Sequence, residues 1–394
     1  MAVKVKDILK KIEEHTQGKI ELVAGEAGLS NLVEWFHTVE ATESTEFLDG
    51  REVIIITGVA LKEKGETLFD IIQSALKKGA SAVIVNTGRH ILTIDPQLSA
   101  FCDEHGLPLF AVPWEVYMTN IAKIIAQEVN NNYKRTNELV SSFKNAIFFP
   151  KKQEFYSADL ARYDYQAEWK YCISIIQVEY PDSEAVVPPE ELRRIKKYLT
   201  NKLAYLAPQA VVFRLNDALV LCFANFQEES ISIIMNQLID NLPRSYKKEF
   251  ILYAGIGRNT LSVRCIHKTY KIAKKVVRLQ TKLARPFEVL SYKDLGISQL
   301  LLAMDDAEIM NEFYSSSLKT LVDYDEMNQT DHTAFLEIYF EEGCRVKETA
   351  ERMYLHRNSI NYKLKKIEEI LACDLSDFAV RVELLVALKL RLLL

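Results

Sequence analysis

The spacing of hydrophobic positions changes several times along the 394-residue chain, which predicts successive domains of different class. Up to about residue 118, short apolar runs alternate with segments of helical periodicity. The uninterrupted run Val53–Ile56 suits a strand covered on both faces, as in parallel βαβ units. Residues 1–118 therefore predict an α/β domain with a mainly parallel sheet. Its expected elements are strands at Glu21–Ala24, Val53–Thr57, Ala82–Asn86 and Leu109–Pro113, and a helix at Thr67–Lys78.

Residues 119–149 have the pattern of one long helix that is apolar near both ends. Its centre is polar, because Asn130, Asn131 and Asn132 follow one another there. A helix of this length between domains is typical of a connector or a dimer seam. A helix that lies on one of its neighbours remains the alternative.

Residues 150–290 predict a second mixed domain, with the order β-α-β-β-α-β and a trailing helix. Two alternating runs flank Asn216-Asp217, which indicates a β-hairpin with its turn at these residues. This order is typical of ferredoxin-like or nucleotide-cyclase-like α+β domains. The expected strands are Tyr171–Glu179, Ala210–Leu215, Ala218–Phe223 and Phe250–Gly257, and the expected helices are Glu190–Tyr205, Ser230–Asn241 and Ser262–Leu283.

The remainder is predicted to be all helical, with a linker at 291–325 and a helix-turn-helix domain at 326–394. A first helix over Asp331–Glu342 stops before a glycine. A second covers Val346–Tyr354, Leu355-His356 makes the turn, and the next helix begins at Arg357. Alanine at position 350 suits the close crossing of two helices in such a motif.

The helix that begins at Arg357 has two unlike faces. Ile360, Leu364 and Ile367 recur at helical spacing and are expected to point inward. The remaining positions carry side chains that hydrogen-bond base edges and phosphates in a major groove. Seven Lys or Arg and two Glu give residues 345–366 a charge of +5, in a chain of net charge −5. The predicted DNA contacts are His356, Arg357, Asn358, Ser359, Asn361, Tyr362, Lys363, Lys365 and Lys366. A basic face that is merely solvated is the alternative.

The segment Val346–Glu369, which contains His-Arg-Asn-Ser-Ile-Asn-Tyr-Lys, resembles the C-terminal helix-turn-helix of the PucR/CdaR class of regulators. Residues 318–331 and 377–389 are similar to the lead-in and closing helix of that domain. Residues 22–29, 52–58 and 79–85 resemble the family's N-terminal PucR-type domain, and 253–258 its degenerate GGDEF-like domain. The resemblance implies a transcription regulator whose effector comes from purine or nitrogen breakdown, or is an amino acid or small organic acid.

The central domain is where an enzyme could be hidden. A diguanylate cyclase carries Gly-Gly-Asp-Glu-Phe on this hairpin, where glycines admit the nucleotide and acids hold magnesium. Here the hairpin reads Leu-Asn-Asp-Ala-Leu over 215–219, so Asp217 is its only carboxylate. No phosphate loop, metal-binding histidine spacing or Gly-x-Ser-x-Gly motif occurs in the sequence. We therefore expect no catalytic residues, no cofactor and no metal.

Two other functions stay open. One is a nucleotide-cyclase-like enzyme with an appended helix-turn-helix. The other is an adaptor that has lost DNA contact, against which the retained Arg357, Asn358, Asn361 and Lys365 argue.

An effector site is expected in the N-terminal domain, because ligands of such sheets bind at the carboxyl ends of the strands. Thr57 and Gly58 follow one predicted strand and precede Lys62, and Arg89 follows the next strand. A hydroxyl, an accessible backbone and two cations could hold a small anion. A plain strand-to-helix turn is the alternative.

The predicted partners are a double-stranded DNA operator, a small-molecule effector and a second copy of the chain. Helix-turn-helix units usually bind as pairs on two half-sites, so a homodimer or higher homo-oligomer is expected. Six scattered cysteines suggest free thiols in a reducing compartment. No membrane span or signal peptide is recognisable, and we expect a cytoplasmic protein.

Overall fold

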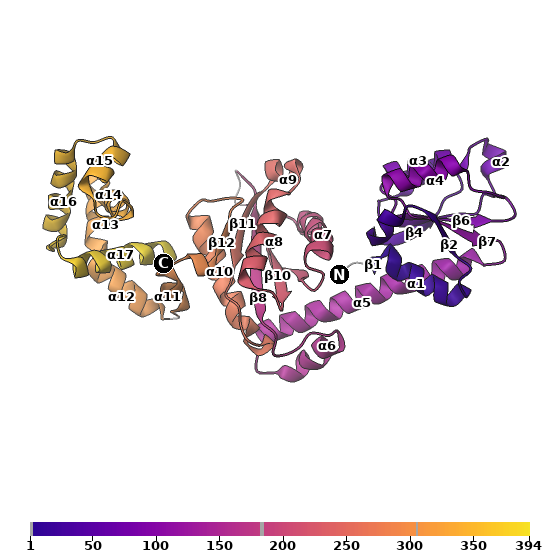
Figure 1. The fold of residues 1–394 in the computed structure, drawn as a ribbon. Helices are drawn as coiled ribbons and strands as arrows, with labels where there is room; N and C mark the ends of the chain where they lie inside the picture. Colours follow the sequence, from indigo (N-terminus) through magenta and orange to yellow (C-terminus); the bar gives the residue numbers. More distant parts are fainter. Residues whose placement is uncertain (1–2, 182–184, 305) are drawn as a thin grey trace. The chain divides into compact units, whose positions relative to one another are not determined.

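The computed structural model describes residues 3–181, 185–304 and 306–394, with the backbone alone for 62 and 63. The chain divides into two compact units, which are Met1–Ala167 with Arg193–Phe213, and Glu168–Leu192 with Arg214–Leu394. Figure 1 shows the elements in chain order.

The N-terminal domain is built on a five-stranded sheet with strand order β2-β7-β6-β5-β4. Strand β2 is antiparallel to β7, and the other neighbours are parallel, which confirms the predicted mainly parallel sheet. The strands are β2 (Glu21–Ala24), β4 (Trp35–Thr38), β5 (Glu52–Ile56), β6 (Ala82–Thr87) and β7 (Leu109–Pro113). A separate antiparallel pair joins β1 (Val3–Lys4) to β3 (Leu32–Val33).

Helices cover both faces of this sheet, as Figure 1 shows. Ile54 and Ile56 of β5 pack with α3 (Leu68–Lys77) and α4 (Pro96–His105) on one face. Val53 and Ile55 pack with α1 (Val5–Thr16) and α5 (Met118–Phe148) on the other. Alternate residues of a strand point to opposite faces, so a strand buried on both sides must be apolar throughout. The short helix α2 (Leu61–Lys64) follows β5.

The long helix α5 packs at both ends and is solvated between them. Ile121 and Ile125 are fully buried against the N-terminal sheet. Leu139 and Phe143 are buried near the other end, where α6 (Ser157–Arg162) follows the helix and the Phe143 ring lies 5.3 Å from that of Tyr165. Both ends of α5 are therefore part of hydrophobic cores.

The central domain has a second five-stranded sheet, with order β12-β11-β8-β10-β9. Strand β8 is antiparallel to β10 and β11, and β12 is parallel to β11. The strands are β8 (Tyr171–Glu179), β9 (Val211–Leu215), β10 (Ala218–Ala224), β11 (Ile251–Ile256) and β12 (Val289–Ser291). The predicted turn is present, and Asn216 adopts a left-handed conformation with φ of 55°. The domain's helices are α7 (Pro189–Leu206), α8 (Glu228–Asp240), α9 (Arg244–Glu249) and α10 (Ile266–Lys282).

The pair Gly255 and Gly257 allows α10 to pack closely on the sheet. A Cβ atom at Gly255 would lie 2.6 Å from Cγ2 of Val277, and one at Gly257 would lie 2.5 Å from Oγ1 of Thr269. Real Cβ atoms do not approach other atoms so closely. These glycines therefore serve helix–sheet packing.

The rest of the chain is helical, as predicted. Leu318, Leu321, Phe335, Ile360 and Ile367 are fully buried in one core that the last helices share. The helices are α11 (Ser298–Ala303), α12 (Ala307–Ser317), α13 (Lys319–Asn328), α14 (His332–Glu341), α15 (Val346–Met353), α16 (Arg357–Leu371) and α17 (Phe378–Leu393).

Candidate nucleic-acid interface

Helices α15 and α16 form the predicted helix-turn-helix. Helix α15 ends where Tyr354 turns left-handed, with φ of 55°, and the N–H of Leu355 then bonds the carbonyl of Ala350 at 3.0 Å. Helix α16 begins at Arg357, and its N-cap is His356, whose Nδ1 accepts the N–H of Asn358 at 3.2 Å. The turn therefore has a well-defined geometry at both helix ends.

Helix α16 buries one face and exposes the other. Ile360 and Ile367 are fully buried, and Leu364 packs against the same core. Besides the N-cap His356, six of the predicted DNA contacts are exposed, and Tyr362 is 71% exposed. They are Arg357, Asn358, Ser359, Asn361, Tyr362 and Lys365.

Two lysines of the predicted set lie nearer the core, at the side of α16 that faces α13 and α14. Lys363 forms an ion pair with Asp331, and its amine lies 5.6 Å from the centre of the Phe335 ring. Lys366 lies over the ring of Tyr324 at 5.8 Å and pairs with Glu369 at 3.5 Å. Both side chains are thus partly occupied by contacts within the domain.

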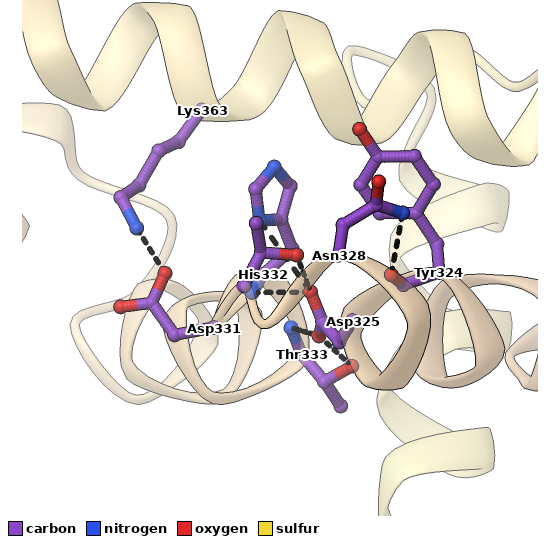
Figure 2. A network of polar contacts seen from close by, with 8 residues as sticks. Tyr324, Asp325, Asn328, Asp331, His332, Thr333 and Lys363 are labelled. Atoms are coloured by element: carbon purple, nitrogen blue, oxygen red, sulfur yellow. Dashed lines mark hydrogen bonds and ion pairs between the residues drawn. The ribbon is translucent and has the colours of Figure 1, made fainter.

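Near Lys363, Asp325 of α13 joins that helix to the start of α14 (Figure 2). One carboxylate oxygen accepts from the Thr330 hydroxyl at 2.6 Å and the His332 N–H at 2.9 Å. The other accepts the N–H and the hydroxyl of Thr333, each at 2.7 Å. Asp325 therefore satisfies backbone donors at the first turn of α14, which have no partner within the helix.

The pKa values of this network follow from burial and hydrogen bonding. Burial raises the pKa of Asp325, but the hydrogen bonds from Thr330, Thr333 and His332 outweigh it, so the net pKa lies below its ordinary value. Burial lowers the pKa of His332, whose Nδ1 lies 3.5 Å from Asp325 Oδ1. Asp325 opposes that effect, while the nearby charge of Lys363 adds to it.

Acidic side chains partly neutralise the positive charge of residues 345–366. Arg352 bonds both Glu341 and Glu342 at 2.7 Å, and Lys347 lies 3.9 Å from Glu351. Exposed cations with no acidic partner in the described part of the chain therefore include Arg357 and Lys365 of α16 and Arg345 at the start of α15.

The residues predicted to bind an effector lie at the carboxyl ends of neighbouring strands β5 and β6. Glu40 accepts the N–H of Thr57 at 2.9 Å and its hydroxyl at 2.6 Å. The second oxygen of Glu40 is buried and has no hydrogen-bond partner within the described part of the chain. The sequence interpretation did not single out Glu40, which stands in a polar stretch without a recognisable motif.

Gly58 and Arg89, two further predicted effector residues, have structural contacts as well. Gly58 has φ of 77°, and a Cβ there would lie 2.7 Å from Cγ1 of Ile91. The Arg89 guanidinium lies 4.9 Å from the centre of the Trp114 ring. The side chain of Lys62 lies outside the described residues.

The described ranges contain no group of three or more His, Cys, Asp and Glu side chains placed to hold a metal ion. Within those same ranges, none of the helices is long and apolar enough to cross a bilayer.

Curated proteins of Bacillus subtilis (strain 168) match parts of the chain. Over 222 residues it is 28% identical to the proline-responsive transcriptional activator PutR, a match that covers 54% of this chain and 52% of that protein. It is 37% identical over 95 residues to the purine catabolism regulatory protein, covering 24% and 18%. It is 28% identical over 153 residues to the DNA-binding transcriptional activator AdeR, covering 38% and 36%. Each match thus spans about half or less of the relative's length.

Among solved structures, a regulator of polyketide synthase expression from Bifidobacterium adolescentis is similar with a TM-score of 0.29 and 16% identity. That likeness covers 64% of this chain and 91% of the other.

Three family matches follow one another along the sequence. Residues 8–129 match the purine catabolism regulatory protein-like family, termed PucR. Residues 153–279 match the GGDEF-like domain, and residues 333–390 match the PucR C-terminal helix-turn-helix domain. The chain therefore belongs to the PucR family, with an N-terminal PucR domain, a GGDEF-like domain and a C-terminal PucR helix-turn-helix.

Proposed function

We propose that the chain is a DNA-binding transcription regulator that reads its operator with the exposed face of α16. The observation that carries this proposal is the division of α16 into a buried apolar face and an exposed face with Arg357, Asn358, Asn361 and Lys365. Arginine and asparagine are suited to bidentate contacts with guanine and adenine in the major groove. The family match over residues 333–390 supports the same role.

The proposal gives different roles to the predicted contacts of α16. Arg357, Asn358, Asn361 and Tyr362 read bases or line the groove, whereas Lys365 contacts phosphate. Lys363 and Lys366 connect α16 to α14 and α13 through Asp331, Phe335 and Tyr324, and Lys366 also pairs with Glu369 of its own helix. These contacts leave both lysines less available to DNA.

Selection of binding sites from random duplex DNA tests the proposal. If the chain acts as a homodimer, enriched sequences will contain two half-sites with centres about 10 base pairs, or a multiple of that, apart. Failure to enrich any sequence under conditions where the chain is folded contradicts specific DNA recognition. Sedimentation of the protein–DNA complex then gives the number of copies bound.

We infer further that a small metabolite acts through the N-terminal domain, at the edge that carries Thr57, Arg89 and Glu40. The buried oxygen of Glu40 that has no partner among the described residues can accept an N–H group from a ligand, and buried polar atoms are normally paired. The names of the relatives point to proline and purine catabolism as sources of such N–H donors.

Thermal shifts with purine catabolites and amino acids identify the ligand, because a ligand that binds only the folded state raises Tm. The site is supported if Glu40→Gln or Arg89→Gln removes the shift. It is contradicted if both variants respond as the unaltered protein does.

The domain organisation of this proposal follows the sequence boundaries. Residues 1–118 form the sensor, 119–149 the connector and 150–290 the GGDEF-like domain, followed by the predicted linker at 291–325 and DNA-binding domain at 326–394. The one departure is at the last boundary, because Leu318 and Leu321 are buried in the core of the DNA-binding helices, so α13 belongs to the DNA-binding domain. No enzymatic activity is part of the proposal.

A further inference from the structure

A cavity of about 240 Å³ opens on the GGDEF-like domain, between the β9–β10 hairpin, strand β8 and helix α10. Its floor is apolar, because Ile175 of β8, Val220 of β10 and Val277 of α10 are all buried. An apolar floor with a few polar groups around it is the usual composition of a small-molecule site.

The rim of this cavity carries charges of both signs. Helix α10 contributes Tyr270, Lys274 and Arg278, which lie four residues apart and so share one side of the helix. The sheet contributes Glu179 at the end of β8 and Asp217 at the hairpin turn. Both cations therefore come from α10, whereas the carboxylates come from β8 and from the β9–β10 turn.

The charge of Asp217 lies close enough to Glu179 and Tyr270 to affect both. Gln177 donates a hydrogen bond from Nε2 to Asp217 Oδ2 at 3.0 Å. Burial, and then the charge of Asp217, raise the pKa of Glu179. The same two causes raise the pKa of the Tyr270 hydroxyl, which lies on the opposite side of the cavity. The side of the rim that carries Glu179 and Asp217 is therefore a region of negative potential, where a ligand cation would be stabilised.

We propose that this cavity binds a small zwitterion of amino-acid type. Its carboxylate would face Lys274 and Arg278, its ammonium group would face Asp217 and Glu179, and its aliphatic part would cover the apolar floor. A simple anion would leave the two carboxylates unpaired, and a simple cation would leave the lysine and arginine unpaired. This site is separate from the one proposed in the N-terminal domain and does not depend on it.

Helix α10 also contacts the segment that leads to the DNA-binding helices. The Lys275 amine donates to the carbonyls of Leu302 and Met304, at 2.7 and 3.0 Å, where α11 ends. Ile272 and Val276 of α10 pack with Leu302 in one hydrophobic cluster, against which Leu393 of α17 also packs. A ligand held by Lys274 and Arg278 thus binds the same helix that contacts α11 and α17. Restraint of α10 by the ligand would change the affinity of the chain for DNA.

Calorimetric titration of the full chain with each of the twenty L-amino acids tests the proposal. For the amino acid that binds most tightly, its N-acetyl and its amide derivatives each lack one of the two charges. Each derivative should bind about tenfold or more weakly, as expected when a hydrogen bond between charged groups is lost.

Substitutions then locate the site. Lys274→Gln and Asp217→Asn should each weaken binding about tenfold or more. The matched control is Lys271→Gln, because Lys271 is exposed on the same helix and does not line the cavity. The affinity of this variant for the amino acid should be unchanged. Circular dichroism and DNA affinity without ligand show that each variant is folded. DNA affinity of the unaltered chain should change when the amino acid is added.

Three results would overturn the proposal. One is that no amino acid binds the unaltered chain. Another is that Lys274→Gln and Asp217→Asn bind the amino acid as the unaltered chain does, which would place the ligand elsewhere. The third is that GTP with Mg²⁺ binds and loses affinity on the same substitutions while amino acids do not compete, which would assign the cavity to nucleotides.

Discussion

The ammonium group of Lys363 forms an ion pair with the carboxylate of Asp331, which joins the middle of α16 to the start of α14. The same amine lies 5.6 Å from the centre of the Phe335 ring, in the core of the domain. Lys363 therefore differs from Lys365, which is exposed and has no ion-pair partner among the described residues. Two lysines only two positions apart are expected to have different roles.

Substitution of these two lysines separates the roles. Lys365→Gln should weaken binding to all DNA sequences and reduce the slope of log K against log salt by about 0.9, because one phosphate contact is lost. Lys363→Gln should leave that slope unchanged and lower domain stability by about 1 kcal/mol or less, the range of a partly exposed ion pair. Fluorescence anisotropy on operator DNA from 50 to 200 mM salt, about the range over which such slopes are measured, checks both. A smaller slope in Lys363→Gln would show that this lysine contacts phosphate.

The strands and helices with regular patterns could be predicted from the sequence. Strand β8 spans Tyr171–Glu179 as predicted, and α16 begins at Arg357 as predicted. Strand β4 (Trp35–Thr38) was not predicted, because an edge strand with exposed residues has no apolar run. Strand β12 has three residues, and its pairing with β11 depends on the intervening helix α10.

Contacts between distant residues could not be predicted in the same way. Asp325 bonds groups seven and eight residues further on, because Gln329 adopts φ of 52° and reverses the chain between α13 and α14. For Lys363 a signal was present in the sequence. It lies three residues after Ile360 and four before Ile367, which is the spacing of the buried face. Its long alkyl chain allows a charged residue to lie beside a core.

Substitutions in the exposed face of α16 test base recognition. Arg357→Ala and Asn361→Ala should each weaken specific binding by about 1–3 kcal/mol and relax the sequence preference at one position, since a base contact is lost. Affinity for unrelated DNA should change little for Asn361→Ala, because asparagine carries no charge. Gel-shift titrations with operator and with scrambled DNA give both numbers.

The matched control for Asn361 is Asn328→Ala. Within the described ranges, the Asn328 amide bonds the carbonyl of Tyr324 in its own helix, at 2.9 Å, so DNA affinity should be retained. Full operator protection by the Arg357→Ala, Asn361→Ala double variant would refute the role of this face.

Substitution of Asp325 tests the junction between α13 and α14. Each carboxylate oxygen of Asp325 accepts two hydrogen bonds. In Asp325→Asn one of these oxygens is replaced by an NH₂ group, which is itself a donor and cannot accept the two bonds. The first turn of α14 should lose about 1–3 kcal/mol of protection against hydrogen exchange. Asp323→Asn on the same helix is the control, because the Asp323 carboxylate makes no hydrogen bond within the described ranges.

The pKa of Asp325 gives this effect a pH dependence. Because the folded-state pKa is lowered, the stabilisation is complete above the unfolded value of about 3.9 and is lost as the pH falls through the folded value. Equal protection of the Asp325→Asn variant and the unaltered protein at neutral pH would exclude this role for the carboxylate.

His332 should make the stability of this domain depend on pH in a different range. Burial lowers its folded-state pKa, so between that value and the unfolded value of about 6.5 the unfolded state binds more protons. Stability should therefore fall as the pH is lowered from about 6.5, and His332→Gln should remove this part of the dependence. Asp325 and Asp331 oppose the lowering of the His332 pKa, whereas Lys363 and Lys366 increase it. Lys363→Gln should therefore raise the folded-state pKa of His332 and reduce the loss of stability at low pH.

Hydrogen exchange of peptides from α14 and α16 is compared at each pH between the unaltered protein and the His332→Gln variant. Because the intrinsic effect of pH on exchange is the same in both proteins, the comparison isolates the contribution of His332. His267 of the GGDEF-like domain also has a lowered pKa, owing first to burial, but it is unchanged in both proteins and lies outside these peptides. A protection difference between the His332→Gln variant and the unaltered protein that stays constant from pH 7 to pH 5, a range that spans the unfolded value of about 6.5, would show that His332 does not titrate there. A difference that changes with pH would mean that protonation of the buried His332 ring weakens the packing of α14 on α16, because the new charge is repelled by Lys363, which Figure 2 shows near that ring, and by Lys366.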